Sequence, residues 1–189
     1  MTITRRRFIR DAGVIVAGAI SGPALIGIGH TQQRTWRAGD PFSLGVASGS
    51  PQSDGFVLWT RLAPKPHSAD TDSVDGMSGE AVTLAYEIAD DPSMRRIVKR
   101  GGAIADPRYG YSVHAEITGL EAGRPYWYRF LSGEATSRVG RAATSPAAGS
   151  TLERLRFGFV SCSNYEHGYF SAYRHLTNDN PDIALCLRR

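Results

Sequence analysis

Two cysteines are the residues of this sequence best suited to metal or redox chemistry. Cys162 belongs to the segment Ser-Cys-Ser-Asn-Tyr at residues 161–165, which directly follows an apolar run, and Cys186 lies within a second apolar run. A deprotonated thiol is a strong ligand for soft or trivalent metal ions, and ligation keeps it deprotonated. A single cysteine is more commonly a small buried hydrophobic residue, so the surrounding elements must decide between the two roles.

Both cysteines are predicted to lie on a strand–helix–strand unit. Residues 154–161 are nearly continuously apolar toward their end, as in strands buried on both faces, and residues 183–187 form a second apolar strand. Residues 169–178 between them carry apolar side chains at helical spacing. Such a unit has parallel strands, and active sites form at the carboxyl ends of parallel strands. Cys162 and Cys186 should therefore lie near each other at one edge, where an oxidising compartment without metal would let them pair.

Upstream of this unit, short segments of alternating apolar and polar residues predict a β-sandwich. Short strands at regular spacing, with turn-forming residues between them, are typical of this architecture. The expected strands are residues 42–49, 55–62, 82–89, 97–99, 111–117, 125–130 and 137–142. Residues 64–79 are rich in glycine, proline and aspartate and are expected to form a loop.

The aromatic residues Tyr126, Trp127 and Tyr128 admit a structural and a functional interpretation. The sequence of residues 120–128 resembles the corner of fibronectin type III-like sandwiches, where a buried tyrosine ring fixes a strand crossing and its hydroxyl bonds nearby backbone. The alternative is a platform on which carbohydrate rings stack. We favour rings that fill the core, because aromatic burial contributes heavily to such cores. His114, similarly, is expected to be a strand-face residue rather than a ligand.

The N-terminus has the layout of an export signal. Residues 4–10 are basic, and the apolar residues 12–29 that come next are interrupted by glycines and a proline. Arg5, Arg6 and Phe8 stand in a pattern that resembles the bacterial twin-arginine signal, which a receptor reads. The alternative, a transmembrane helix, needs about 20 strongly apolar residues. We therefore expect export by the twin-arginine translocation machinery to the periplasm or the cell exterior, with no stable membrane anchor.

The charge distribution argues against a nucleic-acid partner. The 189 residues carry a formal net charge of +4, of which residues 1–30 contribute +3. The remaining body is almost neutral and lacks the basic footprint that binding along a phosphate backbone requires. We therefore expect no nucleic-acid partner.

Longer stretches of the sequence resemble one known family. FSLGVASGSP at residues 42–51 with VLWTR at residues 57–61, and FGFVSCSNYEHGYF at residues 157–170 with AYRH at residues 172–175, resemble PhoD-type alkaline phosphatases. That family combines a twin-arginine signal, a small N-terminal β-sandwich and a C-terminal metallophosphoesterase domain. The motifs lie in both regions of the chain, so the resemblance covers nearly all of it.

The resemblance implies a domain plan for this chain. Residues 1–30 would be the signal peptide, residues 31–150 the sandwich domain, and residues 151–189 the start of the metallophosphoesterase domain. The expected fold class is mainly β, a fibronectin III-like β-sandwich followed by the truncated first βαβ unit of an α/β metallophosphoesterase domain.

The resemblance also implies a metal site. The cysteine of the family's Ser-Cys loop is a metal ligand, and it maps onto Cys162. Family members use iron together with calcium to activate an oxygen nucleophile and to hold the phosphoryl group of a phosphate ester substrate. Cys162 is therefore the expected metal ligand of this chain, and no catalytic residue is assigned.

The sequence departs from the family at its last residues. In the family the second strand runs into a His-Leu-Gly-Asp-Tyr pattern whose aspartate bridges the metal ions, whereas here Leu185 is followed by Cys186, Leu187 and two arginines. A base inserted before the codons GGC-GAC would give CGG-CGA, which encodes Arg-Arg, so we expect a frameshift or a gene truncation. Without the bridging carboxylate the metals should not be retained, and residues 31–189 alone should not catalyse.

Two functions remain open from the sequence. The first is an exported alkaline phosphatase or phosphodiesterase, a metal-dependent phosphoric ester hydrolase, present here as an N-terminal fragment that is inactive by itself. The second is an exported β-sandwich that serves as a binding or structural module and carries a vestigial catalytic tail.

Overall fold

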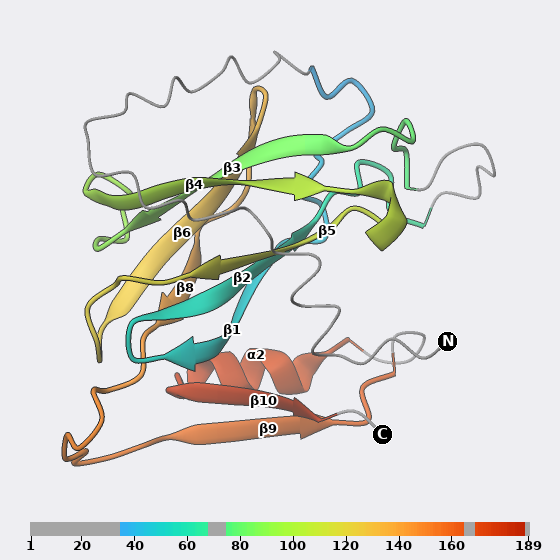
Figure 1. Ribbon diagram of the computed structural model, residues 1–189. Helices are drawn as coiled ribbons and strands as arrows, with labels where there is room; N and C mark the ends of the chain where they lie inside the picture. Colours follow the sequence, from blue (N-terminus) through green and yellow to red (C-terminus); the bar gives the residue numbers. More distant parts are fainter. Residues whose placement is uncertain (1–34, 68–74, 165–168, 188–189) are drawn as a thin grey trace, which may run out of the picture. The chain divides into compact units, whose positions relative to one another are not determined.

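The computed structural model describes residues 35–67, 75–164 and 169–187 of the chain (Figure 1). The chain divides into two compact units, the first ending at Ala148 and the second beginning at Gly149. The expected signal peptide, with Arg5, Arg6 and Phe8, lies outside the described residues. Along the part of the chain that the structure describes, there is no helix long and apolar enough to cross a membrane.

The smaller sheet of the first unit has three antiparallel strands. They are β1 (Val46–Gln52), β2 (Gly55–Arg61) and β5 (Ser112–Ile117), in the order β1-β2-β5. Along β2 the side chains alternate, so that Leu58 and Thr60 are buried between half-buried neighbours. This alternation is the pattern by which a strand presents one face to a core.

The larger sheet is built from five strands. These are β3 (Val82–Ala89), β4 (Ile97–Ala105), β6 (Pro125–Ser132), β7 (Ala135–Thr136) and β8 (Gly140–Ala143). Their order is β4-β3-β6-β7, with β8 also paired with β6, and all pairs are antiparallel. The short 3-10 helix η1 (Pro107–Tyr109) lies between β4 and β5 along the chain.

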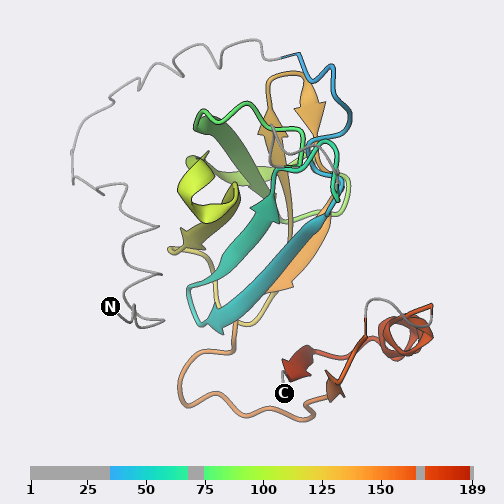
Figure 2. The ribbon, with the colours of Figure 1, turned by 90° about the vertical axis from the view of Figure 1, so that its right-hand side faces the viewer.

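A hydrophobic core lies between these two sheets, which face each other in Figure 2. Leu58 from the smaller sheet and Leu84, Ile88, Tyr128 and Phe130 from the larger one are almost completely buried. Two sheets whose inner faces interdigitate in this way form a β-sandwich. The sandwich expected from the sequence is therefore confirmed.

Tyr126 forms the corner that the sequence predicted. Its ring is buried, and its hydroxyl accepts a hydrogen bond from the backbone N–H of Glu121 (3.0 Å) and donates one to the carbonyl of the same residue (3.3 Å). Tyr128 points into the core as well, whereas Trp127 between them is half-buried on the other face of β6. The interpretation of these rings as core residues is confirmed for both tyrosines.

Two core tyrosines, one on β3 and one on β6, lie over glycines of neighbouring strands. Tyr86 is paired with Gly101, and Tyr128 with Gly140. A Cβ atom at Gly101 would lie 2.2 Å from the Tyr86 hydroxyl, and one at Gly140 would lie 2.4 Å from Cζ of Tyr128. These glycines are required for space, because any side chain would displace a buried ring.

The segment after β8 returns to the smaller sheet. Ser145 donates from its backbone N–H to the carbonyl of Gln52 (2.8 Å) and from its hydroxyl to the carbonyl of Pro51 (3.2 Å). These bonds join the end of the sandwich unit to the end of its first strand. The sandwich is thus closed only by residues about 90 positions downstream of that strand.

Some strand bounds differ from the sequence-based expectation. β1 begins at Val46 because residues 40–45 form a turn, in which Phe42 N–H donates to the Asp40 carboxylate and Gly45 N–H to the Phe42 carbonyl. β4 extends to Ala105, well beyond the expected residues 97–99. The short strand β7 was not expected.

The second unit is a parallel strand–helix–strand arrangement, as predicted. It consists of β9 (Phe157–Ser161), α2 (Ser171–Asn178) and β10 (Ile183–Leu187), with β9 and β10 paired in parallel. α2 begins two residues later than expected, because Phe170 before it has a left-handed backbone (φ 50°). None of the described residues from 149 onward is buried.

Candidate functional site

Cys162 comes directly after the last residue of β9, at the carboxyl end of the strand. Its backbone is left-handed (φ 56°), a conformation that few residues other than glycine adopt. The chain therefore leaves the strand sharply at this residue, and the side chain is exposed. The predicted position at the carboxyl edge of the parallel sheet is the position the structure gives.

Residues on both sides of this loop are joined by a hydrogen bond. The hydroxyl groups of Ser163 and Tyr173 lie 2.6 Å apart, although the two residues are ten positions apart in the sequence. Tyr173 lies in the first turn of α2, and its ring contacts that of Phe170 with 5.7 Å between the ring centres. Sequence reasoning missed this pair, because Tyr173 was interpreted only as an apolar helix position.

Cys186 occupies a different environment from Cys162. It lies inside β10, where it pairs with Val160 of β9. Both cysteines are exposed free thiols, so the disulfide considered from the sequence is not present. The reason is local, since Cys162 has already left the strand path that would carry its side chain alongside Cys186.

At this edge of the sheet, Cys162 is a suitable ligand for a metal ion. An exposed thiol at the end of a parallel strand is a suitable soft donor for iron. Within the described ranges, no group of three or more His, Cys, Asp or Glu side chains is placed to hold a metal ion. Cys162 would thus supply one ligand of any metal site, and the other ligands would come from other residues.

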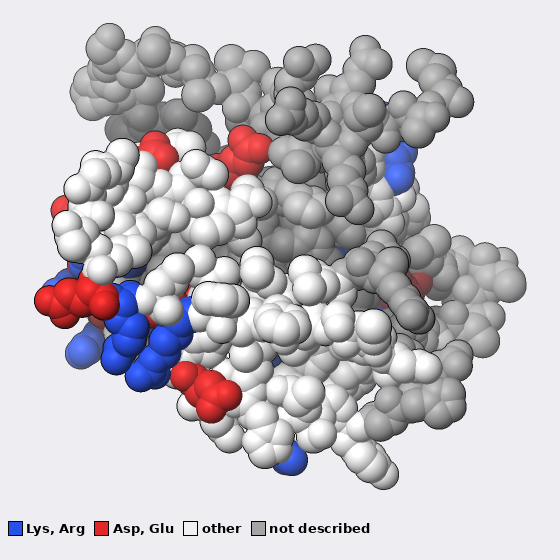
Figure 3. Space-filling view, turned by 90° about the horizontal axis from the view of Figure 1, so that it is seen from below, with Lys and Arg blue, Asp and Glu red and all other residues white. Residues whose placement is uncertain are grey.

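The strands of this unit are neutral and their apolar side chains are exposed. β9 and β10 contain no Lys, Arg, Asp or Glu. One face of the pair carries large exposed side chains, namely Phe157, Phe159, Ile183, Leu185 and Leu187. On the other face Leu176 of α2 lies against Gly158, where a Cβ atom would come within 2.3 Å of it. Neutral side chains also predominate on the face of the molecule in Figure 3, where the visible charges gather mainly at one edge.

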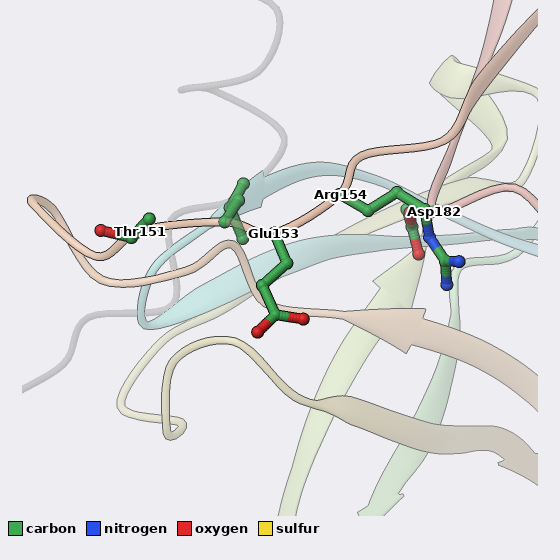
Figure 4. Close-up of a pocket in the computed structure, with 5 residues that line it drawn as sticks. Thr151, Glu153, Arg154 and Asp182 are labelled. Atoms are coloured by element: carbon green, nitrogen blue, oxygen red, sulfur yellow. The ribbon is translucent and has the colours of Figure 1, made fainter.

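A polar hollow lies near the opposite ends of the two strands. It is lined by Thr151, Leu152, Glu153, Arg154 and Asp182 (Figure 4). The Asp182 carboxylate accepts a hydrogen bond from Arg156 N–H (2.8 Å), so it is engaged in fixing the start of β9. In Figure 4 Arg154 and Asp182 lie close together, whereas the Glu153 carboxylate points away from them. Since active sites of parallel sheets form at the carboxyl ends, this hollow is not the candidate site.

His114 behaves as the strand-face residue expected from the sequence. It lies on β5, directly opposite Trp59 of β2. Burial lowers its pKa, so the neutral imidazole is favoured. It belongs to no metal-binding group among the described residues.

A comparison with known protein families matches the sandwich region of the chain. The model of the family described as "PhoD-like phosphatase, N-terminal domain" matches residues 29–146. The chain belongs to the PhoD-like phosphatase family. The match covers the sandwich, and it ends before the Cys162 loop.

Two relatives are similar to this PhoD-like chain, and the first extends the match beyond the sandwich. Alkaline phosphatase D of Bacillus subtilis (strain 168) is 41% identical over 98% of this chain, which covers 31% of that protein. A solved structure of PhoD is 44% identical, with a TM-score of 0.73, over 79% of this chain and 28% of its own. The chain thus spans about a third of the length of the curated relative that it matches.

Proposed function

We propose that this PhoD-like chain forms the N-terminal part of an exported, metal-dependent phosphoric ester hydrolase of the alkaline phosphatase D type. The observation that carries the proposal is the match to alkaline phosphatase D, which continues past the sandwich and through the Cys162 loop. A sandwich used on its own as a module would not need the strand–helix–strand unit. Substrates are phosphate monoesters or diesters.

Cys162 is the residue to which we assign a metal-binding role. Its thiolate would hold iron at the carboxyl end of β9, and calcium would accompany the iron as the family resemblance implies. Such ions, when bound, polarise the phosphoryl group and activate the attacking oxygen. The residues of this chain contribute the position of the thiolate, which β9 and α2 define together.

The proposal includes export, which the resemblance of residues 4–10 to a twin-arginine signal supports. The twin-arginine translocation machinery would be the partner that recognises Arg5, Arg6 and Phe8, and the mature protein would reside in the periplasm or outside the cell. We propose neither a nucleic-acid partner nor a stable membrane anchor.

A second function rests on a separate observation. All residues of the hydrophobic core lie in the sandwich unit, and the described residues of the second unit bury nothing. The sandwich would therefore serve as a binding or structural module even if the second unit did not contribute to catalysis.

A chimera distinguishes these two functions. In it, residues 31–187 replace the matching segment of alkaline phosphatase D, and hydrolysis of p-nitrophenyl phosphate and bis(p-nitrophenyl) phosphate is measured together with iron content. We expect activity, and we expect Cys162→Ser to lower kcat/KM by at least about tenfold, since even residues behind the ligands contribute that much. Cys186→Ser, the matched control, should retain both activity and iron. A folded chimera that remains active and iron-loaded with Cys162→Ser would contradict the assignment.

The chain by itself should give the opposite result. Purified residues 31–189 should hydrolyse neither ester above background, with or without added iron and calcium, because one thiolate cannot hold a dinuclear centre. The measurement is product release over several hours at high protein concentration. Metal-dependent turnover that Cys162→Ala abolishes would show that the ligand set is already complete.

A further inference from the structure

We propose that Tyr173 is a positioning residue for the loop after β9, and that it acts through the Ser163 hydroxyl to fix Cys162 at the carboxyl edge of the sheet. The metal-binding role of Cys162 rests on the proposed function. The positioning itself rests on contacts within the second unit.

The first contact is the 2.6 Å hydrogen bond between the Ser163 and Tyr173 hydroxyl groups. Ser163 is adjacent to Cys162, so the bond acts one residue away from the thiol. A phenol is a stronger donor than an alkyl hydroxyl, because its pKa is lower. Such a short oxygen–oxygen distance is at the strong end of the range for hydrogen bonds between hydroxyl groups.

Tyr173 is itself held by contacts with Phe170. Its backbone N–H donates to the Phe170 carbonyl (3.0 Å). Its ring packs at an angle against the ring of Phe170. The phenol hydroxyl is therefore presented to Ser163 from a fixed point in the first turn of α2.

The helix that carries Tyr173 is in turn fixed on β9. Leu176, one helical turn further along, lies over Gly158 so closely that the glycine has no room for a side chain. Leu176 and Gly158 both belong to the second unit. The contacts therefore run from Gly158 of β9 to Leu176 of α2, and from Tyr173 of the same helix to Ser163, which is next to Cys162.

The backbone conformation of this loop explains why the Ser163–Tyr173 contact is needed. Cys162 (φ 56°) and Phe170 (φ 50°) both adopt the left-handed conformation without being glycine. Residues in this region persist only where the surrounding structure holds them. A metal ligand has to stay within about 0.5 Å of its productive position. The Ser163–Tyr173 bond links the residue after Cys162 to a residue that contacts Phe170 through its ring and its backbone.

The test compares the two thiols of the full chain. Iodoacetamide alkylates exposed cysteines, and peptide mass spectrometry gives the rate for Cys162 relative to Cys186. A hydrogen bond of ordinary strength corresponds to a several-fold change in an equilibrium, so Tyr173→Phe should shift this ratio by about threefold. Ser163→Ala should shift it equally, and the double variant should add nothing, because both remove the same bond.

Thr177→Val is the matched control. It removes a hydrogen bond to the Tyr173 carbonyl but leaves both hydroxyl groups of the proposed contact in place. The thiol ratio should therefore equal that of the unaltered chain. An unchanged ratio in Tyr173→Phe, or an equal change at both thiols, would overturn the proposal.

A second measurement separates this inference from the proposed function. In the iron-loaded chimera, the absorption band of the iron–thiolate bond reports on Cys162 directly. Tyr173→Phe should shift or weaken the band, and Thr177→Val should not. A shifted thiol ratio together with no thiolate band in any variant would reject the metal role of Cys162 while supporting the positioning contact.

Discussion

The Tyr126 hydroxyl group connects β6 to the loop before it. It makes two hydrogen bonds with the backbone of Glu121, on a ring that is buried. Tyr126→Phe leaves the ring but removes both bonds, so we expect a loss of about 1 kcal/mol in the free energy of unfolding. Urea denaturation followed by fluorescence measures this loss.

Tyr111→Phe provides the matched comparison. The Tyr111 ring is equally buried, but its hydroxyl has no hydrogen-bond partner in the described structure. Removing a buried hydroxyl that lacks a partner releases a desolvation cost, so this variant should be as stable as the parent or slightly more stable. Equal destabilisation by the two substitutions would show that the corner bonds contribute nothing.

At the scale of single residues, the sequence predicted the features that a local pattern encodes. The tyrosine corner is predicted by a turn of fixed length before an aromatic strand, and the position of Cys162 by an apolar strand that ends in a polar loop. The Ser163–Tyr173 bond has no such signature. It depends on the path of the loop between β9 and α2, which no periodic pattern describes.

The larger sheet is crossed by a row of three charged residues. Glu87 on β3 lies between Arg100 on β4 and Arg129 on β6, and it pairs with both. Burial alone would raise the pKa of Glu87, but the hydrogen bonds from Arg129 and Arg100 outweigh it and hold the pKa below its ordinary value of 4.5. The carboxylate is therefore more readily ionised in the folded state than in the unfolded state.

This row makes stability depend on pH in a defined direction. A carboxyl group with a lowered folded-state pKa stabilises the fold above its unfolded pKa, and the stabilisation is lost as the pH falls through the folded pKa. We expect Glu87→Gln to reduce the free energy of unfolding by about 1 kcal/mol at neutral pH. The difference from the parent should shrink as the pH falls below 4.5.

Urea titrations across this pH range measure the effect. Glu134→Gln, in the exposed turn between β6 and β7, is the control and should show little difference from the parent at any pH. A Glu87→Gln difference that stays constant down to the acid limit would mean that the carboxylate charge does not contribute.

At the scale of elements, strand boundaries were predicted correctly where apolar and polar residues alternate regularly. They were missed where the alternation is interrupted. β3 has the predicted bounds, residues 82–89, because apolar and polar residues alternate along most of it. β4 was predicted for only three of its nine residues, since Lys99, Arg100 and two glycines interrupt its apolar pattern. The parallel pairing of β9 and β10 was predicted correctly, because a helix between two apolar runs requires it.

At the scale of the whole molecule, the sandwich should fold independently of the second unit. Its core residues all lie before Ala148, and the described part of the second unit exposes a neutral strand pair. We expect residues 31–148 to unfold cooperatively within a few degrees of the full chain, and to be more soluble, because exposed strand edges promote association.

Calorimetry and hydrogen exchange measure this independence. In the full chain, the amides of β9 and β10 should exchange faster than those of β2, β3 and β6, whose bonds are protected by the core. Loss of the cooperative transition on deletion of residues 149–189 would mean that the second unit is part of the sandwich fold.

Export is a property of the protein as a whole, although the expected signal lies outside the described residues. Replacing Arg5, Arg6 and Arg7 together with lysine should leave the protein in the cytoplasm, because the receptor reads paired arginines. Arg7 is included since Arg6 and Arg7 form a second pair. Arg10→Lys is the control and should be exported normally. Cell fractionation and immunoblotting measure the result, and normal export of the triple variant would reject the signal assignment.

The hydrogen bonds from Ser145 to the end of β1 set the earliest moment at which the protein can fold during its synthesis. The first strands leave the ribosome long before the residues that close the sandwich, so they must wait without their final partners. At about 10 residues per second, the ribosome needs several seconds to supply them. A chaperone that binds nascent polypeptides would therefore find its binding sites on β1 and β2 during this interval. A pause of the ribosome shortly after Ser145 has left the exit tunnel would give the sandwich time to close.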